Sequence, residues 1–155
     1  MRPGTHRAYQ RAPPLAWGAL RAYTVAPVTD DELLDAFETC TLGAFHHHDH
    51  VRVTWLYLRR SSVLETLGKL IPGLKRFAES KGRAAHYHET ITWAYTLLIH
   101  DRMRRLADDH TFEEFERENA DLFDWKNSII RRYYDEATLK SEHARRVFVL
   151  PDPAL

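Results

Sequence analysis

Histidine is the residue type whose number and spacing point most directly to chemistry in this chain. The sequence has 10 histidines but a single cysteine, and six of the histidines form two tight groups. The groups are His46, His47, His48 and His50, and then His86 and His88. Imidazole binds transition metals and transfers protons near neutral pH. Any specific function of the chain has to account for this clustering.

Three of these histidines could meet at one metal ion. Residues three or four positions apart share a helix face, so a helix over residues 47–60 would point His47 and His50 in the same direction. His88 begins a strongly apolar segment, where an unpaired polar ring is costly. Two such helices side by side would hold a divalent ion between His47, His50 and His88, with one coordination position open. Zinc, iron, copper and nickel all suit these ligands.

Other candidate residues follow His88 or lie near the C-terminus. Glu89 would be desolvated by the apolar helix, which suits a carboxylate that moves a proton or binds the metal. Ser141 and Arg145 are four residues apart, and on one helix face they could orient an anionic substrate through the guanidinium group. An exposed arginine near a helix end is the alternative interpretation of Arg145. His86 would point away from His88 and is expected to be exposed.

The elements that must position these residues are predicted to be helices. S/T-x-x-E capping boxes begin helices at Ser62 and Thr111, and an apolar stripe follows Thr29. The helix that starts at Ser62 would run toward Gly82. Further helices are expected over 47–60, 84–107, 125–134 and 137–148. The helix over 84–107 should be the most buried, because residues 91–99 are almost wholly apolar. The prediction is an all-α, single-domain bundle of five or six helices.

Composition narrows the class of protein. A chain of 155 residues fits one domain, and 44% hydrophobic with 28% charged residues is typical of a globular protein. The 22 basic and 22 acidic residues balance, so no general attraction to nucleic acid or an anionic membrane is expected. No apolar run approaches the roughly 20 residues that span a bilayer. The lone Cys40 excludes an internal disulfide, and a cytoplasmic location is expected.

Residues 1–29 differ from the remainder of the chain. They contain four arginines, four prolines and no acidic residue. Prolines at this density disfavour a continuous helix. We therefore expect an extended arm over residues 1–29, ahead of a helical metal-binding domain over residues 30–155.

Several blocks of sequence resemble a family of small, uncharacterised bacterial all-helical proteins. The blocks are F-x-H-x-D-H from Phe45, W-L-Y-L from Trp55, Y-H-E-T-x-T from Tyr87, the pair Tyr133 and Tyr134, S-x-x-A-R from Ser141, and Pro151 with Asp152. The resemblance covers residues 30–155 and leaves out the arm. It implies that these blocks belong to one site, and it carries no activity, metal or substrate.

Three functions remain open at this point. The first is a small metalloenzyme that acts on a small anionic molecule, with a redox-neutral lyase or hydrolase favoured and oxygen chemistry open for iron or copper. The second is a non-catalytic metal-binding or sensing module that uses the same residues. The third is a helical interaction protein whose histidines act as a pH switch. The sequence does not specify an oligomeric state.

Overall fold

The structure, a computed structural model, describes residues 29–151, and the predicted arm lies outside this range except for Thr29. The described residues form helices and no strand, which confirms the all-α prediction. The α-helices are α1 (Asp30–Glu38), α2 (His47–Arg60), α3 (Val63–Ser80), α4 (Glu89–Met103), α5 (Phe112–Glu118), α6 (Glu136–Lys140) and α7 (Glu142–Arg146). Short 3₁₀ turns cover Ala84–His86, Ala120–Leu122 and Ile129–Arg132.

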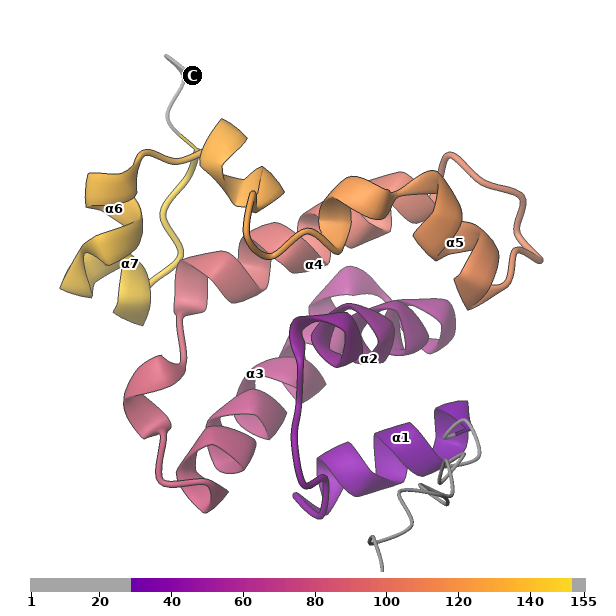
Figure 1. The fold of residues 1–155 in the computed structure, drawn as a ribbon, viewed down its shortest axis with the longest axis horizontal. Helices are drawn as coiled ribbons and strands as arrows, with labels where there is room; N and C mark the ends of the chain where they lie inside the picture. Colours follow the sequence, from indigo (N-terminus) through magenta and orange to yellow (C-terminus); the bar gives the residue numbers. More distant parts are fainter. Residues whose placement is uncertain (1–28, 152–155) are drawn as a thin grey trace, which may run out of the picture.

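Three helices form the centre of the molecule. α2, α3 and α4 contact one another, and α1 packs against α2 and α3 (Figure 1). α5 and the pair α6–α7 lie at opposite ends of α4 (Figure 1). The side chains that lose essentially all solvent contact come from several of these elements: Phe37, Val51, Val53, Ile99, Phe115, Leu122. The histidine groups therefore lie at the starts of two of the helices that form this centre, α2 and α4.

Capping boxes begin the helices where the sequence predicted them. The Ser62 hydroxyl accepts a hydrogen bond from the backbone N–H of Glu65, and the Glu65 carboxylate accepts one from the backbone N–H of Ser62. Thr111 and Glu114 repeat this arrangement at α5. These reciprocal bonds satisfy backbone donors that a helix start leaves without partners. The local pattern was sufficient to predict both starts.

Two predicted helices are divided in the structure. The segment 84–107 contains a 3₁₀ turn, a break, and then α4, because the ring of His88 caps α4 rather than lying inside a helix. The segment 137–148 is divided at Ser141, whose side chain caps α7. The expectation that the helix over 84–107 is the most buried was wrong, since α2 buries more side chains than α4. The expected helix over 125–134 was also wrong, since this segment holds only the 3₁₀ turn Ile129–Arg132. The described residues form seven α-helices, more than the five or six expected.

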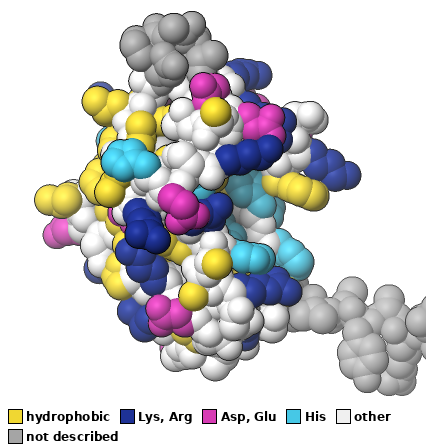
Figure 2. Space-filling view, turned by 90° about the vertical axis from the view of Figure 1, so that its left-hand side faces the viewer, with side chains coloured by type: hydrophobic (Ala, Val, Ile, Leu, Met, Phe, Trp, Pro, Cys, Tyr) yellow, Lys and Arg dark blue, Asp and Glu magenta, His cyan; other side chains and the backbone are white. Residues whose placement is uncertain are grey.

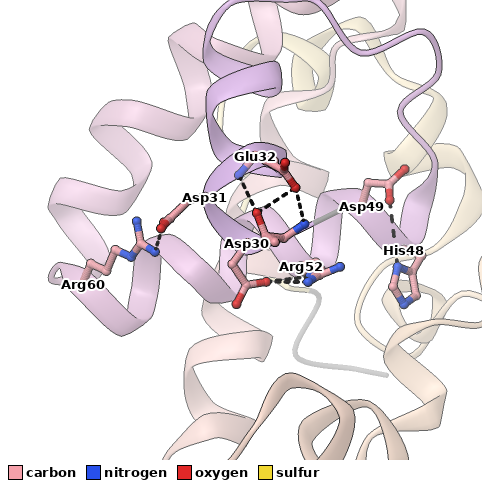
Figure 3. A network of polar contacts seen from close by, with 8 residues as sticks. Asp30, Asp31, Glu32, His48, Asp49, Arg52 and Arg60 are labelled. Atoms are coloured by element: carbon pink, nitrogen blue, oxygen red, sulfur yellow. Dashed lines mark hydrogen bonds and ion pairs between the residues drawn. The ribbon is translucent and has the colours of Figure 1, made fainter. Parts of the chain in front are cut away.

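Ion pairs hold α1 across the outer face of α2. Arg52 donates to the Asp30 carboxylate from Nε at 2.9 Å, and Arg60 pairs with Asp31 at 2.8 Å (Figure 3). The Asp30 pair is partly buried and the Asp31 pair is exposed, so the first contributes more to holding α1. Among the described residues, no helix is both long and apolar enough to cross a membrane.

Close packing of α1 on α3 predicts opposite effects for two glycines of α3. A Cβ on Gly73 would approach two ring carbons of Phe37 to 2.9 Å, whereas a Cβ on Gly68 would meet no atom within 4 Å. We expect Gly73→Ala to lower the free energy of unfolding by about 1–3 kcal/mol through overpacking. Gly68→Ala is expected to raise it by about 0.5–1 kcal/mol, because alanine favours a helix. Urea denaturation of both variants checks this, and equal effects would contradict it.

Candidate functional site

A cavity of about 610 Å³ brings the two histidine groups together. It lies between the segment that leads into α2, the C-terminal half of α3, and the turn that precedes α4. We call it the histidine pocket, defined by its polar lining residues: His46, His50, Lys81, Arg83, His86, Tyr87, His88, Thr92. Figure 2 shows histidine side chains gathered on one face of the molecule, with Lys and Arg side chains beside them.

The formally charged side chains that line the histidine pocket are all positive. Lys81 and Arg83 are exposed side chains that line it, and no carboxylate of residues 29–151 does. Within this range neither cation forms an ion pair with an acidic side chain. A concave site lined by unpaired cations attracts anions. The lining therefore favours a negatively charged ligand.

His50 is the histidine best placed to act on a ligand. It lies one turn into α2, and its ring centroid is 4.0 Å from that of Phe45. Burial lowers the pKa of His50 to about 4, His47 acts in the same direction, and Asp49 and the backbone of Phe45 oppose the shift. The ring is therefore neutral at pH 7. A neutral imidazole keeps one nitrogen that can accept a proton.

His47 and His88 are instead tied to distant parts of the chain. His47 Nε2 lies 2.7 Å from the carbonyl oxygen of Leu122. His88 Nε2 lies 2.9 Å from the carbonyl oxygen of Leu139, and its Nδ1 accepts a bond from the backbone N–H of Ile91. Both nitrogens of His88 thus have protein partners. In this geometry His88 supports the start of α4 and the position of the C-terminal segment.

The predicted metal ligands are only partly brought together. His50 and His88 line the histidine pocket, whereas His47 lines a smaller cavity that adjoins it. Among residues 29–151, no group of three or more His, Cys, Asp or Glu side chains is arranged to hold a metal ion. A site formed by His47, His50 and His88 with a divalent transition metal stays a prediction.

Glu89 lies outside the histidine pocket in a polar cluster at the start of α4. Its carboxylate accepts hydrogen bonds from the hydroxyl of Tyr87 at 2.8 Å and from the indole N–H of Trp93 at 3.0 Å. The Nζ of Lys75 lies 3.6 Å from Oε2 of Glu89. The same carboxylate raises the pKa of Tyr87, together with burial, which is the larger cause. Glu89 therefore fixes the residue that forms part of the pocket wall.

Ser141 and Arg145 also have structural partners. The Ser141 hydroxyl accepts from the backbone N–H of Ala144 and donates to the carbonyl of Thr138, so it joins α6 to α7. The Arg145 guanidinium donates to the carbonyl oxygens of Ala85 at 2.9 Å and Tyr87 at 3.5 Å. These contacts hold the turn that carries His86 and His88. The predicted catalytic roles of both residues stay predictions.

No motif indicated Lys81 and Arg83 as residues that line the pocket. His46, Tyr87 and Thr92 also line it, and the sequence placed them in the first histidine group and the Y-H-E-T-x-T block without assigning them a role. The signal that could have indicated the two cations is that residues 80–88 contain Lys81 and Arg83 and no acidic residue. His86 is exposed, as expected, and still lines the pocket. Comparison of the chain with protein-family models, curated proteins and solved structures finds no match.

Proposed function

We propose that this chain is a small-molecule enzyme that binds an anionic substrate in the histidine pocket and moves a proton with His50. The observation that carries the proposal is the lining itself, which combines Lys81, Arg83 and four histidines with no carboxylate of residues 29–151. Substrate sites are concave and place few polar groups precisely. The histidine pocket has this character, and its volume of about 610 Å³ suits a small molecule.

A bound anion would raise the basicity of His50. Burial lowers the pKa of this ring to about 4. A negative charge nearby favours the imidazolium form and raises the pKa again. Substrate binding therefore prepares the ring to accept a proton, from carbon in a lyase reaction or from water in a hydrolase reaction. These redox-neutral classes are the reactions we favour.

Binding of simple anions tests the proposal. Inorganic phosphate and acetate should shift the ring resonances of the pocket histidines in NMR titrations of the full chain. The double variant Lys81→Gln with Arg83→Gln should weaken binding about tenfold, as expected for loss of two partly solvated charge contacts. The control, Arg104→Gln with Lys126→Gln, removes the same charge from exposed sites outside the pocket and should leave the affinity unchanged. Equal weakening in both double variants would overturn the proposal.

Dependence on a divalent transition metal is the second candidate, and the observation that favours it is the presence of His46, His50, His86 and His88 around one cavity. Such a site would need their ring nitrogens to turn toward one point. Zinc, iron, copper and nickel remain the candidate ions.

Elemental analysis of tag-free protein tests whether the protein depends on a metal. About one equivalent of metal, lost in His50→Ala, supports it, and a metal-free protein that still binds anions removes it. Retained metal without anion binding would indicate the non-catalytic metal-binding alternative.

A further inference from the structure

A second cavity of about 260 Å³ continues the histidine pocket toward the core. Four side chains line both cavities and mark where they meet: His50, Leu74, Ile91 and Thr92. We call the second cavity the inner recess. Beyond these four residues, its apolar wall comes from Val51 of α2, Leu70 of α3 and Ile99 of α4. The recess thus lies between the three central helices of the fold.

Apart from the imidazole of His50, the polar groups of the inner recess described here are already engaged with the protein. The Thr54 hydroxyl donates to the carbonyl of His50, and the Thr92 hydroxyl donates to the carbonyl of His88. The Tyr95 hydroxyl is bonded to Ser128 at 2.8 Å, and Nε2 of His47 is close to a backbone carbonyl. A ligand that entered the recess would therefore meet mainly methyl groups and ring faces. Such a surface stabilises apolar groups and offers little to polar ones.

We propose that the substrate is an anion that carries an apolar group of about the size of a phenyl ring or a short alkyl chain. The anionic group would lie beside Lys81 and Arg83, and the apolar group would enter the inner recess past His50. An apolar cavity of about 150 Å³ holds benzene, so 260 Å³ is sufficient for such a group. This inference rests on the proposed function, because it takes the anion site as given and adds the shape of the ligand.

The position of His50 between the two cavities fits a role at the middle of such a ligand. The ring belongs to both cavities, so it would face the bond between the anionic head and the apolar group. A molecule with both parts would be held at two ends with its middle against the imidazole. Holding the reacting atoms in this way is a large source of rate enhancement. A purely polar anion would fill only the outer pocket.

A series of carboxylates tests the inference on the full chain. Dissociation constants of acetate, butyrate, hexanoate and decanoate are measured by NMR titration of the wild-type protein. The affinity should rise about fourfold for each added CH₂ while the chain enters the recess, and should level off once the recess is full. Benzoate should bind more tightly than acetate. Equal affinities across the series, with acetate bound, would overturn this inference and leave the proposed anion site intact.

Variants at the junction locate the effect. Ile91→Trp places a large ring where the two cavities meet, and Ile91 is only partly buried, so the cavities can receive the ring. Hexanoate should then lose its advantage over acetate, measured as the ratio of the two dissociation constants in the same variant. Leu97→Trp is the matched control, because Leu97 is an exposed apolar residue of the same helix outside both cavities. A chain-length gain that survives Ile91→Trp would overturn the inference, and failure of every carboxylate to bind would overturn the proposed function.

Discussion

Replacing His50 with glutamine is expected to reduce by about 2 kcal/mol the loss of stability that the wild-type protein shows between pH 7 and pH 5. The pKa of His50 is lowered by burial from its ordinary value of 6.5 to about 4 in the folded protein. In the unfolded chain the ring titrates near 6.5. Between these values the unfolded state binds a proton that the folded state does not, so stability falls as the pH falls.

The size of this effect follows from the two pKa values. With values of 6.5 unfolded and about 4 folded, the wild-type protein should lose about 2 kcal/mol between pH 7 and pH 5 through His50. Near pH 4 the folded ring also takes up its proton and the slope disappears. His47 adds to the shift, while Asp49 opposes it. Lys81 and Arg83 are the charged side chains that line the same cavity, and His86 and His88 are the other titratable imidazoles in its lining.

Urea denaturation at several pH values, on wild-type protein and His50→Gln, measures the difference between the two slopes. The difference isolates His50 from the other histidines, whose titration is common to both proteins. His86→Gln is the matched control, because it replaces an exposed histidine of the same pocket with the same side chain. Parallel curves for the wild type and His50→Gln would show that folding does not lower the pKa of the ring, and His50 would then not be the neutral base of the proposed site.

Local sequence patterns were sufficient for most of the helices. The capping boxes at Ser62 and Thr111 are short-range interactions, and each begins a helix within one residue of the expected position. The divisions at His88 and Ser141 could not be predicted in this way. A helical pattern spans each of these residues, and nothing local shows that its side chain caps the next helix. In both cases a side chain that could have lain inside a helix caps one instead.

The site was harder to predict than the fold, and the reason is visible in the hydrogen bonds of two histidines. The spacing of His47 and His88 suggests ligands on facing helices, but their ring nitrogens are bonded to the carbonyls of Leu122 and Leu139. Those carbonyls belong to segments more than fifty residues away in the sequence. No helical periodicity can indicate such partners. The sequence did indicate that the two histidine groups meet, and members of both groups line the histidine pocket.

The apolar recess was equally beyond local patterns. Val51, Leu70 and Ile99 belong to three helices, and each fits an ordinary core position of an amphipathic helix. A cavity is a property of how side chains from different elements fail to fill a space, whereas a pattern within one element only indicates which side is buried. The composition of the recess could be read from the sequence, but its existence could not.

Replacing His88 with alanine is expected to lower the free energy of unfolding by about 2–4 kcal/mol, with or without a metal chelator. The side chain is 8% exposed. Its loss removes the cap of α4, which is worth about 1 kcal/mol. It also leaves the partly buried carbonyl of Leu139 without its hydrogen bond, at a cost of about 1–3 kcal/mol. His88→Asn should recover the part due to the cap, since asparagine is a good N-cap residue.

The chelator makes this a test between two roles of His88. A histidine that supports the start of α4 stabilises the protein in EDTA as much as in zinc, because its partners are Ile91 and Leu139. A histidine that acts as a metal ligand stabilises only the metal-bound protein, so the difference between wild type and His88→Ala would vanish in EDTA. His86→Ala, an exposed neighbour, should change stability by less than about 0.5 kcal/mol in either condition. A difference that disappears on chelation would restore His88 to the metal site and remove it from the scaffold of the pocket.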